Sequence, residues 1–415
     1  MRAVARGKVR YGSRVRKSPK AVSSAAAAQL SSINGSTISD TSHMRAINAR
    51  AIFQVLRRDA WEPTLTDLKE ATGLSRPTLE AGLAELAAKG WVAELSPVEK
   101  PLHSGRPARR YRFLAESGCV AGIDVGPNKV DLHVADLRGD LLATSRVYPA
   151  ANAPLTPTMV HAMLAELLDR PALAGRTLHM VTVGVPGVVN NAGELTHSFV
   201  MPHWANVAVR EELAALMGAA VRLENDANLA TQTEFSIGSG QHSDSMIYLM
   251  LGTRISSGSI INGRLHRGAH GAAGEVGSLP TRLWPDVRLE LLSELRQRPA
   301  TGSAETERSD SDLMQEVFTT ASAGDPVATA RVRRFVAGIA DALMVLLLAL
   351  DPELVVVGGG TARAGEALLE PLQQALNVRT LVPVPVELAT HADGAVVEGA
   401  LLTALADLRA DVFGG

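Results

Sequence analysis

Three successive segments between residues 43 and 114 repeat apolar residues at the spacing of an amphipathic helix. Thr64 and Ser75 are typical N-caps for the second and third segments, and Gly73 is a typical helix-ending residue between them. This pattern predicts a helix, a short turn and a second capped helix, which is the geometry of a helix-turn-helix. The residues predicted to face the core are Ile47, Ala51, Ile52, Val55, Leu56, Leu65, Leu68, Ala71, Leu79, Leu83 and Leu86.

Two short β-prone stretches follow the third helix, at Trp91-Val92 and at residues 109–113. They predict the two strands of a wing, joined by a basic loop, so residues 43–114 are expected to form a winged helix-turn-helix. After a linker at residues 115–118, strand-like and helix-like segments alternate to the C-terminus, which is typical of an α/β domain. One hairpin is predicted there from residues 246–251, which lead into a Gly252-Thr253 turn and a returning strand.

The amino-acid composition indicates a globular protein with a disordered N-terminal tail. With 46% hydrophobic and 20% charged residues, most of the chain is typical of a water-soluble globular protein. Residues 1–42 are basic, then rich in Ser and Ala, and lack hydrophobic periodicity, so they are expected to be disordered. No apolar stretch follows the basic N-terminus, so we expect a cytoplasmic protein, with an organelle transit peptide as the alternative for this Arg-rich tail. The single cysteine, Cys119, excludes an intramolecular disulfide framework.

The net charge of −2 conceals a strong asymmetry along the chain. Residues 1–116 carry 20 Lys and Arg against 10 Asp and Glu, a net charge of +10, whereas the remaining residues carry 21 against 33, a net charge of −12. A basic arm on an acidic body indicates that the N-terminal part binds a polyanion, the alternative being a tail that only aids solubility.

The exposed first turn of the third helix offers side chains suited to reading DNA. Arginine matches the acceptor pair of guanine, and glutamate accepts from the amino group of cytosine. A basic wing can add a minor-groove or phosphate contact. The candidate DNA-binding residues are Arg76, Pro77, Thr78 and Glu80 on the helix, with Arg106 and Arg109 on the wing. The alternative is a small helical module used for dimerisation or protein docking.

Several motifs together resemble those of ROK-family transcriptional regulators, over the whole of residues 43–415. They are Ser-Arg-Pro-Thr at residues 75–78, Gly-Arg-Pro-Ala at 105–108, Val-Gly-Val-Pro-Gly at 183–187, Leu-Glu-Asn-Asp-Ala-Asn at 223–228, Arg-Gly-Ala-His-Gly-Ala-Ala-Gly-Glu at 267–275, and the glycine turn that ends at residue 360. The resemblance implies a two-lobed sugar-kinase-like domain of the actin/hexokinase (ribonuclease H-like) fold at residues 117–415. Lobe one is expected at about 117–222 plus 395–412, and lobe two at about 223–394.

The resemblance also implies a sugar site. A predicted strand at residues 221–223 places Asn225 and Asp226 at its C-terminal end, the usual ligand edge of such sheets. In kinases that are similar to this chain, the aspartate matching Asp226 is the general base, while the residues matching Asn225 and Glu275 hydrogen-bond sugar hydroxyls. The alternative for the Asn-Asp pair is a cap of the helix that follows.

The kinase machinery departs from the family pattern at both phosphate loops. The first keeps Asp124 and Gly126 but continues with Pro127-Asn128, and proline has no N–H to offer an anion. In the second, Gly252 and Thr253 lead into Arg254 and then Ser256-Ser257, where such a loop needs bare backbone. Gly358 and Gly359 match the adenosine-side turn. Arg254 is interpreted as a surface arginine or as a side chain that binds the phosphate of an effector.

The family's metal site is also missing. Ser278 stands where the family has a histidine, and no cysteine occurs between residues 278 and 296, where a zinc-binding cluster is expected. We therefore predict no metal, no cofactor and no phosphoryl transfer, since that reaction depends on positioning and electrostatics.

Two classes of function follow. The first is a transcriptional regulator, most simply a repressor of carbohydrate genes, that binds a palindromic operator in double-stranded DNA as a homodimer or tetramer and senses a sugar or sugar phosphate. The second is an active sugar kinase with an added DNA-binding domain. A third hypothesis is a regulator controlled by a protein partner.

Overall fold

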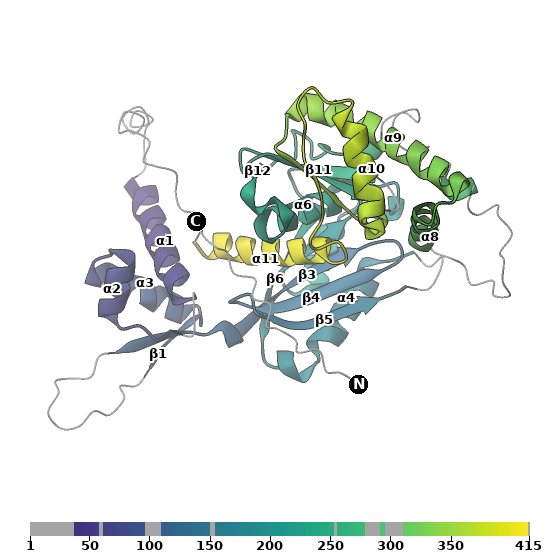
Figure 1. The fold of residues 1–415 in the computed structure, drawn as a ribbon. Coiled ribbons are helices and arrows are strands. Elements are labelled where there is room, and N and C mark those ends of the chain that lie inside the picture. The colour runs from purple at the N-terminus through teal and green to yellow at the C-terminus, as the bar shows by residue number, and fades with distance from the viewer. Residues whose placement is uncertain are drawn as a thin grey trace, which may run out of the picture.

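The computed structural model describes residues 37–57, 61–95, 109–149, 154–252, 255–278, 291–294 and 310–413. A small N-terminal unit, residues 37–95 and 109–113 within those ranges, stands beside an α/β domain built on two five-stranded sheets (Figure 1). The presence of strands and helices in alternation confirms the predicted α/β character of the chain after residue 117.

The N-terminal unit has three helices and a two-stranded antiparallel sheet. Thr64 caps the second helix in a full capping box with Asp67, Gly73 ends it at φ +72°, and Ser75 caps the third. These three features confirm the sequence prediction for this segment. The elements are α1 (Thr37–Leu56), α2 (Leu65–Thr72), α3 (Arg76–Ala88), β1 (Val92–Leu95) and β2 (Arg110–Phe113).

Several details differ from the sequence prediction, and one of them is that Ala71 of α2 is exposed although it was expected to face the core. Helix α1 begins at Thr37, inside the predicted tail of residues 1–42. Ile47 was expected in the core but is 46% exposed, because the buried stripe of α1 begins at Ala49 and continues through Ile52, Phe53 and Leu56. The expected linker is a short 3₁₀ turn, Ala115–Ser117, and Ala115 is buried in the same apolar cluster as the N-terminal unit. The prediction of disorder for residues 1–36 lies outside the described residues.

The first sheet of the α/β domain has the order β5-β4-β3-β6-β9. Alternate residues of β3 point to opposite faces: Cys119, Ala121 and Ile123 pack in one cluster with α4 and α5, while Val120 packs in another with α11. Gly122 lets α11 approach closely, since a Cβ there would lie 2.4 Å from the backbone nitrogen of Leu401. The elements are β3 (Gly118–Val125), β4 (Val130–Asp136), β5 (Leu141–Val147), β6 (Thr177–Val185), β9 (Ala220–Asn225), α4 (Pro157–Leu168), α5 (Val209–Met217) and α11 (Ala395–Phe413).

The second sheet has the order β12-β11-β10-β13-β14, and α8, α9 and α10 cover one face of it. The antiparallel pairing of β10 with β11 confirms the predicted hairpin. A small ribbon, β7 (Val188–Val189) with β8 (Leu195–His197), extends the region after β6. The elements are β10 (Met246–Leu251), β11 (Ile255–Ile261), β12 (Arg264–Leu265), β13 (Leu354–Gly358), β14 (Val386–Leu388), α8 (Asp310–Ser322), α9 (Pro326–Leu350) and α10 (Glu366–Asn377).

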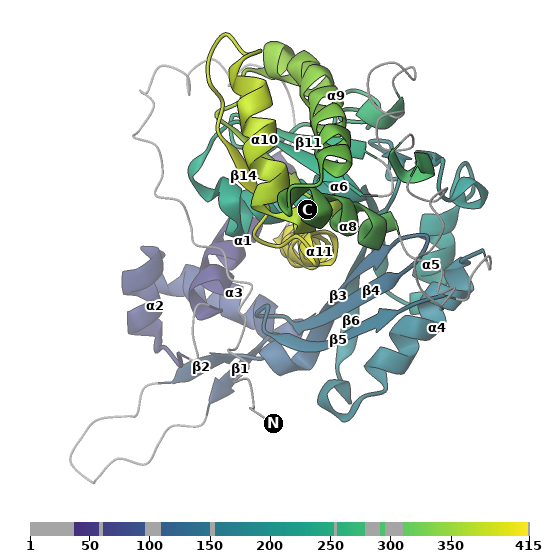
Figure 2. The ribbon, with the colours of Figure 1, turned by 45° about the vertical axis from the view of Figure 1, so that its right-hand side comes forward.

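Two helices connect the lobes. Helix α6 (Asp226–Ile237) packs against the second sheet and against α11, and both helices lie between the two sheets (Figure 1, Figure 2). Strand β9 extends the first sheet to Asn225, three residues beyond the expected lobe boundary at 222. Among the described residues, none of the helices is long and apolar enough to span a lipid bilayer.

The core of the N-terminal unit is continuous with the α/β domain. One cluster of buried residues contains Phe53, Leu56 and Trp91 together with Leu405 and Leu408 of α11. The N-terminal unit is therefore packed against the last helix of the chain rather than held by a free linker.

Candidate functional site

A cavity of about 120 Å³ lies between the two lobes. It is lined by residues from both predicted phosphate loops and from the predicted sugar site: Pro127, Pro186, Gly187, Phe199, Val200, Asp226, Met250, Gly252, Ile255, Ser256 and Glu275. Because small-molecule pockets usually measure roughly 300–1,000 Å³, this cavity in its present form suits one sugar ring or a smaller polar ligand.

Asn225 lies beside this cavity and connects residues that line it. It ends β9 and caps α6, and its Oδ1 accepts the backbone N–H of Asn228 at 2.9 Å. Its Nδ2 donates to the carbonyl oxygen of Gly187 at 2.9 Å and to Oε1 of Glu275 at 3.0 Å. The Oδ1 of Asn225 thus caps α6, as the alternative interpretation expected. Its Nδ2 connects the segments of Gly187 and Glu275, which both line the cavity. The predicted trio of Asn225, Asp226 and Glu275 is brought together.

The pKa of the Asp226 carboxyl group is raised. Burial, and then the nearby carboxylate of Asp124, raise the pKa of Asp226 to about 7, although the backbone N–H of Ala227 donates to its Oδ1 at 2.8 Å. A carboxyl group with a pKa near neutrality can exchange a proton with a hydroxyl ligand at physiological pH. This is the one feature of the cavity that a catalytic base also requires.

We expect Asp226→Asn to make the ligand-free protein more stable at neutral and alkaline pH. The folded pKa of Asp226 lies above its ordinary value of 3.8, so wild-type stability is lost as the pH rises from about 4 through about 7. Asparagine keeps an Oδ1 acceptor and removes the charge. Urea unfolding between pH 5 and pH 8.5 should show a difference between the two proteins that widens up to about pH 7 and is constant above it. A difference that does not vary with pH would contradict this assignment.

In the first predicted phosphate loop, side-chain and backbone groups pair with one another. The Lys129 ammonium contacts Oδ2 of Asp131 at 2.6 Å and Oδ2 of Asp124 at 3.4 Å. Although burial lowers it, the carboxylate of Asp124 and the hydrogen bond to Asp131 hold the pKa of Lys129 above its usual value. The backbone N–H of Gly126 donates to the carbonyl of Lys129 at 2.9 Å. This loop closes on itself, with the carboxylate of Asp124 paired to a side chain.

The second loop differs from the sequence interpretation. Ser257 does not lie in the turn: it is buried in β11, and both its N–H (2.9 Å) and its hydroxyl (3.3 Å) donate to the carbonyl of Gly274. It therefore anchors the segment that carries Glu275. Ser256 lines the cavity, as does Gly252. Thr253 and Arg254 lie outside the described residues, so both interpretations of Arg254 stay predictions.

The glycine turn after β13 has a structural reason that involves no nucleotide. Gly359 has φ +83°, and a Cβ there would lie 2.8 Å from the carbonyl carbon of Leu251. Gly358 is equally constrained, because its Cβ would lie 1.9 Å from the hydroxyl of Tyr248. Both glycines thus permit close packing against β10 and the end of the hairpin.

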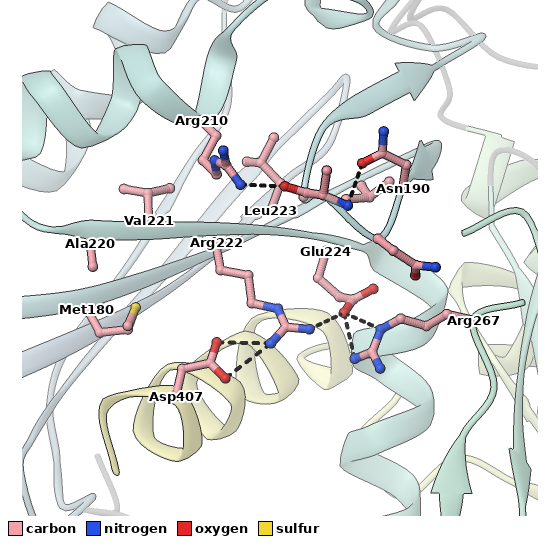
Figure 3. A pocket seen from close by; sticks show the side chains of 14 residues that line it. Met180, Asn190, Arg210, Ala220, Val221, Arg222, Leu223, Glu224, Arg267 and Asp407 are labelled. Atoms are coloured by element: carbon pink, nitrogen blue, oxygen red, sulfur yellow. Dashed lines mark hydrogen bonds and ion pairs between the residues drawn. The ribbon is translucent and has the colours of Figure 1, made fainter. Parts of the chain in front are cut away.

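Sequence reasoning missed an ion-pair network beside the sugar motif. Buried Glu224 accepts from Arg267 (2.8 Å) and Arg222 (2.9 Å), and Arg222 continues to Asp407 of α11 at 3.0 Å (Figure 3). These four side chains line a pocket of about 490 Å³ along the outer edge of β9. The two charged residues of β9, Arg222 and Glu224, indicated such a network, but Asp407 lies too far along the chain to be paired with them by spacing. Glu224 links the sugar motif, the signature segment and α11.

The N-terminal unit carries a separate groove of about 690 Å³ between α3 and the two-stranded sheet. Arg76, Glu80 and Arg109 all line it. Arg76 pairs with Glu80 at 2.9 Å, and Arg109 pairs with Glu94 at 3.1 Å, each with roughly half or more of its side chain exposed. Pro77 is exposed beside Arg76, and the hydroxyl of Thr78 lies 2.8 Å from that of the cap Ser75. Arg106 lies outside the described residues.

The chain is similar to two kinds of known protein, sugar kinases and transcriptional regulators. The model of the ROK family matches residues 120–288 and 295–407. A glucokinase of Streptomyces coelicolor is 28% identical over 288 residues, covering 62% of this chain and 86% of the enzyme. A xylose repressor of Caldicellulosiruptor bescii is 22% identical over 372 residues, covering 83% of this chain and 92% of the repressor.

Among solved structures, too, a regulator matches more of this chain than a kinase does. A ROK-family glucokinase from Streptomyces griseus, in complex with glucose and AMPPNP, matches with a TM-score of 0.57 and 25% identity, over 69% of this chain and 99% of the enzyme. A ROK-family transcriptional regulator, a homolog of the E. coli MLC protein, matches with a TM-score of 0.66 and 19% identity, over 90% of this chain and all of the regulator. A match over 90% of 415 residues is longer than residues 117–415 alone and therefore extends into the N-terminal part of the chain. The match to the enzyme leaves almost a third of the chain uncovered.

Proposed function

Because this chain belongs to the ROK family, we propose that it is a DNA-binding transcriptional regulator of carbohydrate genes. In this proposal, residues 43–114 are a winged helix-turn-helix, and residues 117–415 sense a sugar or sugar derivative without phosphorylating it. The protein binds a palindromic operator as a homodimer or tetramer, and the ligand favours one arrangement of the DNA-binding units. It represses these genes while it is bound to the operator, and a ligand that favours the arrangement with the lower affinity for DNA relieves the repression.

The observation that carries the proposal is the length of the match. The kinases cover 62–69% of this chain, no more than the length of the α/β domain, whereas the MLC homolog and the Caldicellulosiruptor xylose repressor cover 90% and 83%, which is longer than that domain. The groove lined by Arg76, Glu80 and Arg109, together with the positive charge of residues 1–116, suits the phosphates and base edges of DNA. The internal pairing of Lys129 with Asp124 supports a domain that binds ligands without transferring phosphate.

The proposal is tested by selection from a library of random DNA duplexes with the purified full-length protein. We expect enrichment of sequences with two-fold symmetric half-sites, and we expect one or more sugars or sugar phosphates to weaken or strengthen binding to them. Failure to enrich any sequence would contradict the regulator. Enrichment of a motif whose binding no small molecule changes would instead favour control by a protein partner.

Arg76→Ala is expected to weaken binding to the selected operator by about 1–3 kcal/mol and to relax the preference at one base pair. Lys89→Ala is a matched control, since Lys89 forms the equivalent (i, i+4) pair with Glu85 on the same helix at 3.0 Å. Fluorescence anisotropy with the operator and single-base variants measures both effects. Equal losses of operator affinity for the two variants would show that the first turn of α3 does not lie in the DNA groove.

Active sugar kinase is the second candidate function, and the pKa of about 7 at Asp226 favours it. An ATP-hydrolysis assay over a panel of sugars, with a ROK glucokinase as positive control, separates the two. We expect no sugar-dependent turnover above background. Turnover that Asp226→Asn abolishes would instead establish the kinase.

A further inference from the structure

The junction between α1 and α11 contains an unusual group of positive charges. The C-terminal end of α11 lies beside α1 (Figure 1), and Leu405 and Leu408 share a buried cluster with Phe53 and Leu56 of that helix. Arg409 follows Leu408 directly, at the edge of this shared cluster. The arginine thus stands where the N-terminal unit meets the α/β domain.

Two further arginines lie on the side of Phe53: Arg50 in α1, and Arg57, which follows the last residue of α1 and whose N–H still donates to the carbonyl of Phe53 at 3.1 Å. Arg50 and Arg57 flank the buried Phe53 at positions i, i+3 and i+7, which share one face of a helix. The carbonyl oxygen of Arg57 accepts a hydrogen bond from Nη1 of Arg138 at 3.1 Å. Because Arg138 belongs to the turn after β4, the end of α1 is fixed relative to the first sheet.

Arg409 differs from the arginines that form ion pairs elsewhere in the α/β domain. Its Nε and Nη2 are buried, and neither has a hydrogen-bond partner within the described part of the chain. By contrast, Arg222 reaches both Asp407 and Glu224, and Arg146 reaches Asp131. Burial, and then the charges of Arg57 and Arg50, lower the pKa of Arg409 to about 9, so it still carries its charge at pH 7. A buried cation without an acceptor is costly unless a counter-ion completes the site.

We propose that Arg50, Arg57 and Arg409 form a binding site for a phosphate group at the junction of the two parts of the chain. Planar guanidinium forks match phosphate oxygens in pairs, and three positive charges suit a dianion better than a single carboxylate. The phosphate group comes either from a small molecule, such as inorganic phosphate or a phosphorylated metabolite, or from the DNA backbone. No residue of α1 or α11 is among those that line the groove of α3, so this site is distinct from the proposed reading surface.

Such a phosphate would bridge the helix that begins the N-terminal unit and the helix that ends the α/β domain. Since it binds only when both are in place, it stabilises the folded junction by mass action. Apolar replacement of Arg409 removes an unsatisfied charge, so Arg409→Met is expected to be at least as stable as the wild type without phosphate and to gain nothing from phosphate.

The test is thermal unfolding of the full-length protein at pH 7.5 in sodium phosphate, compared with sodium chloride at equal ionic strength. We expect a saturable rise in Tm for the wild type and for the control Arg333→Met, an exposed arginine of α9, and none for Arg409→Met. Arg50→Gln, a surface change with little risk to folding, should weaken the apparent phosphate affinity about tenfold. A second arm measures the affinity of the same proteins for a DNA duplex of unrelated sequence over a range of salt concentrations.

The outcomes separate the two sources of phosphate. A rise in Tm with phosphate that requires both Arg409 and Arg50 establishes a small-molecule site. No rise, together with duplex binding whose salt slope falls by about 1 in Arg409→Met, establishes a DNA-backbone contact. The proposal is overturned if neither phosphate nor the duplex distinguishes Arg409→Met from the wild type. It is equally overturned if Arg409→Met is less stable without phosphate, because Arg409 would then already have a partner.

Discussion

Replacing Glu224 with alanine is expected to lower the free energy of unfolding by about 3–5 kcal/mol, the usual cost of breaking a buried ion pair from one side. Glu224 is 2% exposed and accepts hydrogen bonds from Arg222, Arg267 and the Nδ2 of Asn228. Its removal leaves two guanidinium groups and one amide without their shared acceptor. Urea unfolding monitored by circular dichroism measures the loss.

The same change should also weaken ligand binding at the cavity between the lobes. Glu224 immediately precedes Asn225 and Asp226, and Arg267 begins the segment that carries Glu275. Sugar affinity, once a ligand is found, should therefore fall along with stability. Glu211→Ala is the control, because Glu211 is an exposed partner of Arg210 on α5 and its loss should change neither quantity measurably.

The stabilisation by Glu224 has a definite pH dependence. Burial would raise the pKa of Glu224, but the hydrogen bond and charge of Arg267 and the charge of Arg222 lower it overall below its ordinary value of 4.5. The contribution is therefore fully present above about pH 4.5 and is lost as the pH falls through the folded pKa. The difference between wild type and Glu224→Ala should be constant from pH 6 to pH 8 and shrink at acid pH. A difference unchanged at pH 3 would show that the carboxylate is not the stabilising group.

Local signals in the sequence were sufficient for much of the fold. The capping box of Thr64, the left-handed Gly73 and the cap Ser75 act over three or four residues, so their spacing alone predicts α2 and α3. Strand β9 and the position of Asn225 at its end follow from the Val-Arg-Leu stretch at residues 221–223 and the polar residues that come after it. In each case the structure is decided by neighbours in the chain.

What the sequence could not supply is which side chains and carbonyl groups pair, both within a loop and between distant segments. Lys129 closes the first loop by pairing with Asp124 and Asp131, whereas the sequence showed only that Pro127 removes an N–H. Ser257 looked like part of a damaged turn, but its partner is the carbonyl of Gly274, seventeen positions further on. Asp407 and Arg409 acquire meaning only when α11 is placed across the first sheet and against α1. Spacing along the chain carries no information about such partners.

Replacing Phe53 with alanine is the second change with a large expected effect, about 3–5 kcal/mol of unfolding free energy. Phe53 is 1% exposed, and its ring lies 5.4 Å from that of Trp91 and 5.2 Å from that of Phe113, edge to face with the latter. The cavity left by the ring lies in the cluster that also holds Leu405 and Leu408 of α11. The damage should therefore spread beyond the N-terminal unit.

Hydrogen exchange followed by mass spectrometry distinguishes a shared core from two independent parts. In Phe53→Ala, we expect faster exchange in α1 and in the second half of α11, while β13, whose core is a different cluster, keeps its protection. Phe199→Ala is the matched control, since that ring is 68% exposed and its loss should cost less than about 0.5 kcal/mol. Faster exchange confined to α1, α2 and α3 would show that α11 does not share their stability. If α11 responds, the helix that reaches Glu224 through the Arg222–Asp407 pair also stabilises the N-terminal unit. One packed element then joins the cavity between the lobes to the proposed DNA-binding surface.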